Sequence, residues 1–280
     1  MRNVLVTGAT GVLAKKFISK FSNQYNIIEG VRNPENSKQL QVESWAEIQT
    51  PIEINAIVHF AGKYLVDDSL KTIKVVSDAV IGTATSLADF SKKNRIPIVA
   101  LGSYFENAPK SQQPWSHYSV AKHSAAQILE IASSTHDIPM RYLYAYDTYG
   151  NDLKRRKIID VLLDPSTQSL ELSHGEQKMN LTYDDDFVDA IRISLDEMFL
   201  NGGGFIKNQI RNPNDEFSLR NIAETINSFR NQKIDLKFGL KPYRRHEVFE
   251  VWDCAANIDG WNPRTKFLEY VKFKVREISD

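Results

Sequence analysis

Tyr118 and Lys122 are the residues of this chain whose types and spacing most directly suggest chemistry. They stand four residues apart, so in a helix they lie on one face, about one turn from each other. A nearby ammonium favours the phenolate form of a tyrosine and can lower its pKa from the usual value of roughly 10. The pair therefore predicts a proton donor or acceptor for a carbonyl and its alcohol. Because such pairs also arise by chance, the prediction depends on other motifs.

The start of the chain supplies a second motif, a glycine-rich turn between a strand and a helix. The apolar residues Val4–Val6 are followed by the pattern T-G-x-x-G-x-x-A, which ends at Ala14. Glycines at such a turn let the backbone approach a pyrophosphate, and the helix N-terminus supplies N–H groups and a positive dipole end. An ordinary turn can have the same glycines. Its place directly after a strand favours a dinucleotide site, made by Thr7, Gly8, Thr10, Gly11, Val12 and Leu13.

The composition agrees with an enzyme of one large domain or two coupled lobes. The chain has 280 residues, and lysine plus arginine equals aspartate plus glutamate at 35 each, so no nucleic acid or membrane surface is expected as a partner. No apolar run could span a bilayer and no signal-peptide pattern precedes Val4, so we expect a cytoplasmic protein. Cys254 is the only cysteine, which excludes an intrachain disulfide and speaks against a thiolate metal site.

The first half of the chain alternates between buried strands and amphipathic helices. Strands are expected at residues 4–6, 25–31, 56–62, 96–102 and 139–144, and helices after residue 12 and at 72–93 and 118–133. This alternation predicts an α/β fold with a parallel sheet, helices on both faces and ligands at the carboxyl ends of the strands. Those ends are Thr7-Gly8, Gly30–Arg32, Phe60–Gly62, Gly102-Ser103 and Tyr146–Gly150. The stretch between Val31 and Ala56 gives no strong strand signal.

These motifs together resemble the extended short-chain dehydrogenase/reductases of the NAD-dependent epimerase/dehydratase family. The resemblance rests on the glycine-rich turn, the segment His59-Phe60-Ala61-Gly62, a strand ending at Ser103, and Y-x-x-x-K. It continues through Tyr149-Gly150, residues 154–159, 170–177 and 182–190, and Gly260-Trp261-Asn262-Pro263. The L-S-x-G-E-Q motif at 172–177, with Arg155-Arg156-Lys157 before it, is similar to the sequences of CDP-sugar and dTDP-sugar 4-keto-6-deoxyhexose reductases, including abequose and paratose synthases.

The resemblance implies a Rossmann-type doubly wound parallel sheet with a smaller C-terminal lobe. Residues 1–149 would bind NADP, with a returning segment near 178–200, and residues 150–280 would mainly bind substrate. In the family, a residue at the position of Ser103 hydrogen-bonds the substrate oxygen, Tyr118 gives a proton to the carbonyl, and Lys122 also binds the nicotinamide ribose. Phe60, Ala61 and Gly62 would line the cofactor site.

Arg32 is expected to select the cofactor. NAD enzymes usually end the second strand with an acidic residue that binds the ribose 2′-hydroxyl. This chain has Gly30-Val31-Arg32 there, and a cation pairs instead with the 2′-phosphate of NADP. NADP(H) is therefore the preferred cofactor, with NAD(H) as the alternative. A solvated loop arginine would show the same sequence.

The resemblance places the substrate among residues of the second half. Cations there would meet the pyrophosphate of a sugar nucleotide, although any one of them could be an ordinary surface charge. The expected substrate-binding residues are Ser103, Tyr104, Arg155, Arg156, Lys157, Lys178 and Arg244. Three departures affect the substrate side: many members have arginine near Lys178, asparagine in place of Ala79, and a longer loop between Ser103 and Tyr118.

The expected function is NADPH-dependent reduction of a nucleotide-linked 4-keto-6-deoxy sugar, in deoxyhexose biosynthesis for a surface polysaccharide such as the lipopolysaccharide O-antigen. An epimerase that retains NAD is the alternative, and a non-catalytic dinucleotide sensor is a third. A dehydratase would need an acidic pair directly after Ser103, where Tyr104-Phe105 stand, with Glu106 alone beyond. A homodimer is expected, through the helices at 72–93 and 118–133.

Overall fold

The computed structural model describes residues 1–280 except 32, 37–38, 42–52, 66, 68, 110–115, 153–155, 245–246 and 280. Its main feature is a seven-stranded sheet in the order β10-β6-β5-β4-β1-β2-β3. The strands are β1 (Arg2–Thr7), β2 (Tyr25–Val31), β3 (Gln39–Gln41), β4 (Ala56–His59), β5 (Ile98–Ser103), β6 (Met140–Ala145) and β10 (Phe205–Ile210). All neighbouring pairs are parallel, which confirms the predicted doubly wound fold.

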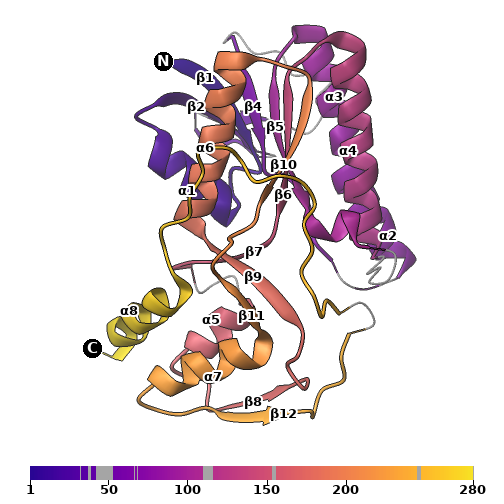
Figure 1. Ribbon diagram of the computed structural model, residues 1–280. Coiled ribbons are helices and arrows are strands. Elements are labelled where there is room, and N and C mark those ends of the chain that lie inside the picture. The colour runs from indigo at the N-terminus through magenta and orange to yellow at the C-terminus, as the bar shows by residue number, and fades with distance from the viewer. Residues whose placement is uncertain are drawn as a thin grey trace.

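Helices cover both faces of this sheet (Figure 1). One face carries α2 (Leu70–Ser77), the π-helical turn η2 (Asp78–Gly82), α3 (Thr83–Asn94) and α4 (His117–His136), and the other carries α1 (Val12–Phe21) and α6 (Asp184–Asn201). Strand alternation sorts the core in the same way. Leu5 packs with the α2–α4 side, whereas Val4 and Val6 pack with the α1–α6 side. The sheet is therefore apolar on both faces, as a buried parallel sheet requires.

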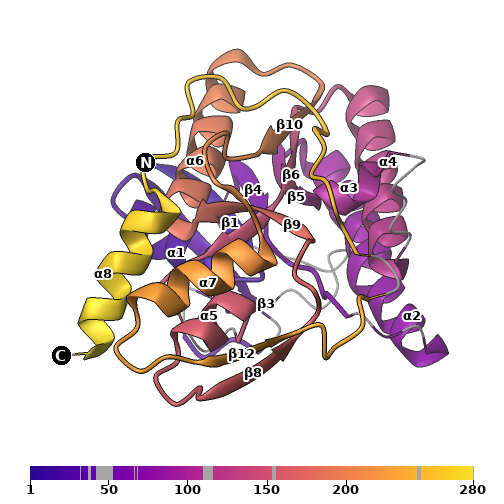
Figure 2. The same ribbon diagram turned by 60° about the horizontal axis from the view of Figure 1, so that its bottom comes forward.

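A smaller lobe lies at the carboxyl edge of the large sheet (Figures 1 and 2). It contains the sheet β11-β9-β7 and the pair β12-β8, with its own core of Leu162, Leu181, Ile222 and Val271. Its elements are β7 (Asp147–Tyr149), α5 (Ile158–Leu163), β8 (Ser169–Leu172), β9 (Lys178–Tyr183), β11 (Glu216–Ser218), α7 (Leu219–Phe229), β12 (Asp235–Phe238) and α8 (Phe267–Ser279). Within the expected returning segment, β9 lies in this lobe, and α6 packs on the large sheet.

The strand register aligns the ends that were expected to bind ligands. Thr7 is paired with both Gly30 and His59, and Ser103 is paired with Ala145. The chain leaves β6 at Ala145 and enters the small lobe at Asp147. The carboxyl ends of the strands therefore meet at one edge, facing the small lobe.

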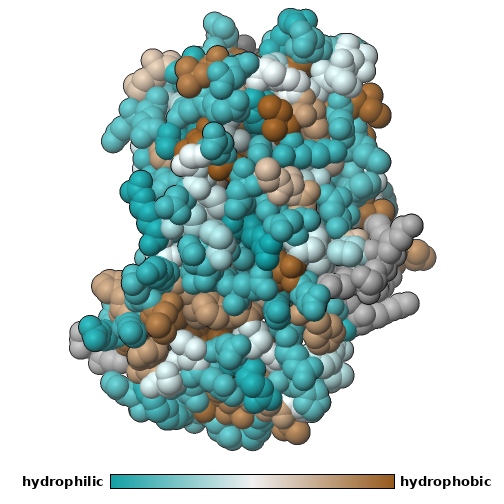
Figure 3. Space-filling model, in the orientation of Figure 1, coloured by the Kyte–Doolittle hydropathy of each residue, from teal (hydrophilic) through white to brown (hydrophobic). Residues whose placement is uncertain are grey.

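The surface is largely polar on the face shown in Figure 3, where hydrophobic residues form separate spots, the broadest of them over the smaller lobe. In the small lobe, α8 exposes Leu268 and Phe273. Across the described residues, we find no helix with the length and apolar character needed to cross a membrane.

Candidate active site

The glycine-rich turn joins β1 to α1 and packs closely against the end of β4. Gly8 has φ +67°, and a Cβ at this residue would lie 2.8 Å from the backbone nitrogen of Ala61. Only glycine meets both demands without strain. The N–H of Gly11 donates to the carbonyl of Gly8 at 2.8 Å, and α1 begins at Val12 with no side chain capping its N-terminus. Thr10 and Gly11 are exposed, so the turn offers backbone N–H groups to a pyrophosphate, as a dinucleotide requires.

Thr7 is the last residue of β1, directly before the glycine-rich turn. Its hydroxyl is buried and lies 2.7 Å from Nδ1 of His59, at the end of β4. Burial lowers the pKa of His59 to about 3, and the charge of Lys122 acts in the same direction. His59 is therefore neutral, and the pair holds the ends of β1 and β4 together beneath Phe60, Ala61 and Gly62.

Ser103 is the last residue of β5 and the N-cap of a 3-10 turn, η3 (Tyr104–Asn107). Its hydroxyl accepts a hydrogen bond from the N–H of Phe105 at 3.4 Å, which leaves its proton available for a substrate oxygen. Glu106 completes a capping box by accepting a hydrogen bond from the N–H of Ser103 at 2.5 Å. The turn thereby fixes Ser103 at the edge of the sheet.

Tyr118 and Lys122 lie one turn apart on α4, as their spacing predicts. Ser116 caps the helix by accepting a hydrogen bond from the N–H of Ser119 at 3.2 Å. Lys122 is only 7% exposed, and its ammonium donates to the carbonyl of Leu101 on β5 at 2.7 Å. A Cβ on Gly62 would lie 3.6 Å from the same Nζ. The lysine therefore reaches the edge between β4 and β5, beside the expected cofactor segment.

The protonation of Tyr118 differs from the sequence expectation. Burial raises the pKa of its phenol well above the usual range, and the charge of Glu106 adds to the rise. Burial also lowers the pKa of Lys122, against the opposing effect of Glu106. The expected lowering of the tyrosine pKa is therefore not observed, because desolvation of the phenol dominates and the ammonium is directed to Leu101. Tyr118 therefore holds its proton at neutral pH.

Asp147 and Tyr64 are two residues of this region that sequence reasoning did not select. The Tyr64 ring meets the Tyr118 ring edge to face, with centroids 5.0 Å apart. Oδ2 of Asp147 is buried and has no hydrogen-bond partner within the described part of the chain. Burial raises the pKa of Asp147 to about 6, while the charge of Lys157 and a hydrogen bond with Tyr104 oppose the rise. The signal for Asp147 was its place just after a strand, at the expected ligand edge.

The predicted substrate-binding cations have different surroundings. Arg244 lies close enough to Tyr64 to lower the pKa of its phenol against the effect of burial, and Lys157 interacts with Asp147. Both therefore belong to the region around Tyr118. Lys178 lies 3.8 Å from a carboxylate oxygen of Glu216, and no contact links it to Tyr118 within the described residues. Arg156 is exposed at the end of a loop with φ +53°.

Tyr104, Arg32 and Arg155 are the remaining predicted residues. Tyr104 is buried, and its ring stacks on that of Tyr146 with centroids 4.7 Å apart, so its side chain packs within the protein. Arg32 and Arg155 lie outside the described residues.

Within the described ranges, no cluster of three or more His, Cys, Asp or Glu side chains could hold a metal ion.

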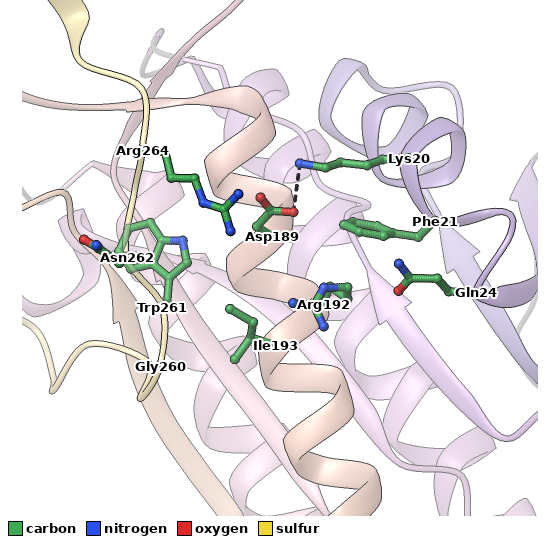
Figure 4. A pocket seen from close by; sticks show the side chains of 10 residues that line it. All are labelled: Lys20, Phe21, Gln24, Asp189, Arg192, Ile193, Gly260, Trp261, Asn262 and Arg264. Atoms are coloured by element: carbon green, nitrogen blue, oxygen red, sulfur yellow. Dashed lines mark ion pairs between the residues drawn. The ribbon is translucent and has the colours of Figure 1, made fainter.

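A separate hollow of about 540 Å³ lies between α1, α6 and the segment Gly260–Arg264 (Figure 4). Its lining includes Lys20, Arg192 and Arg264, and none of the catalytic candidates. Lys20 pairs with Asp189 at 2.8 Å, and Arg192 pairs with a carboxylate of the next turn of α6 at 2.7 Å. Two of its three cations are thus neutralised within the protein, and we assign no ligand to it.

Known proteins share the fold of this chain. The sequence is 24% identical over 294 residues to CDP-abequose synthase of Yersinia pseudotuberculosis, covering 98% of this chain and 99% of that protein. The structure is similar to MoeE5 in complex with UDP-glucuronic acid and NAD (TM-score 0.81, 16% identity, 99% of each chain). It is also similar to UDP-glucose 4-epimerase of Thermotoga maritima with UDP-glucose (TM-score 0.77, 18% identity, 99% of this chain and 98% of the other). The pattern of one family matches residues 4–203, and this chain therefore belongs to the NAD dependent epimerase/dehydratase family.

Proposed function

We propose that the protein is an NADPH-dependent reductase of a nucleotide-linked 4-keto-6-deoxy sugar. The observation that carries the proposal is the set of Ser103, Tyr118 and Lys122 at the carboxyl edge of the large sheet, with Lys122 directed to the carbonyl of Leu101 on β5. Reduction of a ketone consumes a proton, and a partly buried phenol beside the substrate can supply it. The substrate class rests on the similarity to CDP-abequose synthase, which extends along nearly the whole of both chains.

The cofactor residues fit a dinucleotide. In the turn from Gly8 to Leu13, Gly8 and Gly11 have no side chain, and within the described part of the chain no side chain caps the N-terminus of α1. Phe60–Gly62 follow β4 beside this turn, and Lys122 reaches Gly62. Arg32 would pair with the 2′-phosphate of NADP. When bound, NADPH supplies the hydride that C4 of the sugar receives.

The catalytic residues complete the reduction. The Ser103 hydroxyl donates a hydrogen bond to the C4 carbonyl oxygen, and Tyr118 transfers its proton to that oxygen as C4 receives hydride. The carbonyl thus gains a hydride on carbon and a proton on oxygen, and becomes an alcohol. Lys122 stabilises the resulting Tyr118 phenolate by its positive charge until solvent restores the proton.

The sugar nucleotide is proposed to lie between the large sheet and the small lobe. Oδ2 of Asp147 is a buried acceptor that has no partner among the described residues, which matches a donor such as a sugar hydroxyl. Arg244 and Lys157 supply positive charge for the pyrophosphate. Tyr64 forms a wall beside Tyr118. The small lobe is accordingly proposed as the substrate-binding lobe.

A nucleotide-sugar epimerase with retained NAD is the second candidate, because the fold is similar to a UDP-glucose 4-epimerase. An epimerase uses the same tyrosine as acid and base in turn, with no net redox change. Arg32 favours the reductase, since an internal redox cycle usually accompanies NAD. A non-catalytic dinucleotide sensor would not need Ser103, Tyr118 and Lys122 together.

The test is incubation of the pure protein with NADPH and a panel of 4-keto-6-deoxy sugar nucleotides carrying CDP, dTDP, GDP or UDP. The reductase oxidises one NADPH per sugar and yields a 4-hydroxy product. Interconversion of 4-hydroxy sugar nucleotides with no NADPH consumed would establish the epimerase instead. NADPH binding with neither reaction would favour the sensor.

We also propose that the protein is a homodimer through α4 and the α2–α3 helix. Apolar residues of the latter, including Val76, Val80 and Leu87, are buried within the subunit against the sheet. The outer face of α4 has apolar side chains available, with Val120 47% and Ile131 65% exposed. These two residues are eleven positions apart and therefore lie on one helix face.

A further inference from the structure

Glu106 is a buried carboxylate placed directly beneath the catalytic residues. It is 2% exposed. It accepts hydrogen bonds from the N–H of Ser103 and from the hydroxyl of Tyr142, and the hydroxyl oxygen lies 3.0 Å from each carboxylate oxygen. A carboxylate is rarely buried so fully unless partners compensate for the lost water. Here both partners belong to the large sheet, so the carboxylate is fixed relative to β5 and β6.

The same network reaches α4. The Tyr142 hydroxyl also lies 3.2 Å from the backbone carbonyl oxygen of Lys122. Gly102 makes room for this contact, because a Cβ there would lie 2.3 Å from a ring carbon of Tyr142 and 2.9 Å from Oε1 of Glu106. Glu106 therefore accepts from the backbone N–H of Ser103, and the Tyr142 hydroxyl that lies beside it is also close to the backbone of Lys122.

Glu106 faces charged and titratable groups from several elements. They are Tyr118 and Lys122 on α4, Tyr142 and Tyr144 on β6, Lys207 on β10, and Cys254. Tyr64 lies against Tyr118 from the loop after β4, and His59 faces Lys122 from the end of that strand. Since His59 is neutral, Lys122 and Glu106 are the opposite charges at the centre of this group.

Glu106 and Lys122 each favour the charged form of the other. Burial raises the pKa of Glu106 to about 7, with Lys122 foremost among the groups that oppose the rise. Burial lowers the pKa of Lys122, and Glu106 opposes that change. An ionised Glu106 therefore favours the ammonium form of Lys122 and the neutral phenol of Tyr118, which are the two forms that the proposed reduction uses.

We propose that Glu106 is a positioning residue whose buried negative charge keeps Lys122 protonated while its hydrogen bonds hold Ser103 in place. Its role for sugar reduction rests on the proposed function, but its effect on Lys122 does not. Glu106 acts through Lys122 and Ser103 and does not itself contact the substrate.

Two variants separate charge from shape. Glu106→Gln keeps a side chain of the same size that can still accept the Ser103 N–H, but removes the charge. Glu106→Asp keeps the charge on a shorter side chain. A nearby opposite charge typically shifts a pKa by about 1–3 units, so Lys122 should lose its proton at a pH about one unit or more lower in the glutamine variant only.

The readout is the pH dependence of NADPH affinity, measured by nucleotide fluorescence, because it needs no sugar substrate. We expect the affinity to fall with rising pH as Lys122 is deprotonated, with a midpoint that moves to lower pH in Glu106→Gln and stays in Glu106→Asp. Equal midpoints in all three proteins, or equal shifts in both variants, would show that the charge has no such role. If neither variant folds, Lys122 is titrated directly in the wild type by NMR of its isotope-labelled side chain. Its signal should respond to the ionisation of Glu106 as well as to its own, because a nearby opposite charge shifts a pKa. A Lys122 signal with no response where Glu106 ionises would overturn the proposal.

This assay also distinguishes the two proposals. Failure of all 4-keto sugars as substrates would leave the NADPH titration unaffected, whereas an unmoved titration with active sugar reduction would reject only the role of Glu106. Where a sugar substrate is found, the alkaline limb of its kcat profile should move in the same direction as the binding midpoint.

Discussion

The hydroxyl of Thr7 lies 2.7 Å from Nδ1 of His59, and this buried pair joins the ends of β1 and β4 beneath the cofactor turn. His59 remains neutral in the folded protein, since burial lowers its pKa from 6.5 to about 3. In the unfolded chain the same imidazole takes up a proton near its usual pKa. The pair therefore links the stability of the cofactor edge to pH.

Folding stability should decline on acidification between these two pKa values, because the unfolded state binds more protons there. The contribution of His59 is present above pH 6.5 and is lost as the pH falls towards about 3, by up to about 1.4 kcal/mol per pH unit. His59→Gln should remove this slope. Denaturant unfolding at several pH values measures it, and equal slopes in both proteins would contradict the assignment.

Cofactor choice is predicted to depend on Arg32. Its charge-assisted contact with the 2′-phosphate should be worth on the order of 1.5–3 kcal/mol, or about 10- to 100-fold in affinity for NADPH over NADH. Arg32→Asp should reverse or flatten that preference. Arg95→Asp is the matched control, because Arg95 ends α3 before β5, at the opposite edge of the sheet. Equal binding of both cofactors by the wild type would exclude the role.

Asp147 is predicted to bind the sugar nucleotide. Asp147→Ala should raise KM for the sugar nucleotide about 10- to 100-fold through loss of a charged hydrogen bond, and leave NADPH affinity near that of the wild type. Asp147→Asn, which retains an acceptor oxygen, should have a smaller effect. Glu171→Ala removes an exposed carboxylate on β8 and should change neither value. An unchanged KM in Asp147→Ala would remove this residue from the substrate site.

The wild-type protein is predicted to be a dimer at micromolar concentration. Ile131→Lys places a charge on the outer face of α4 and should shift the mass measured by light scattering towards the monomer. Leu200→Lys, at an equally accessible position (Leu200 is 80% exposed) on α6 across the sheet, should leave the dimer intact. A monomeric wild type would disprove the proposed interface.

The sequence predicted the large sheet well because its strands are apolar on both faces and bounded by glycine or charged residues. The strand at Tyr25–Val31 agrees with β2 residue by residue, whereas the short, polar β3 at Gln39–Gln41 gave no hydrophobic signal. The helix expected at 72–93 is interrupted by the π turn η2. That turn packs against α4, and hydrophobic periodicity does not describe such a contact.

The site was predictable in its backbone motifs and less so in its electrostatics. The spacing of Tyr118 and Lys122 placed both on one helix face, but the direction of the Tyr118 pKa depends on burial and on Glu106. The four-residue pattern from Ser103 to Glu106 has the form of a capping box, which gives a local signal for that contact. The contact of Glu106 with Tyr142 joins residues 36 positions apart and could come only from the fold.

The catalytic set is predicted to respond in a graded way. Lys122→Met should reduce turnover severely and also weaken NADPH binding, because one ammonium serves the phenolate and the ribose. Ser103→Ala should have a smaller effect, since water can partly replace a neutral hydroxyl. Turnover and NADPH affinity measured on both variants check this order, and normal NADPH binding by Lys122→Met would contradict it.

The most direct test of the account is the rate of hydride transfer in Tyr118→Phe, measured in a single turnover with NADPH and the 4-keto sugar nucleotide that the wild type reduces. The variant should fold and bind NADPH, and should lose about 10²–10⁴-fold or more in rate, the usual contribution of general acid catalysis. Near-normal reduction by Tyr118→Phe would contradict the central claim, because the proton would then come from another group.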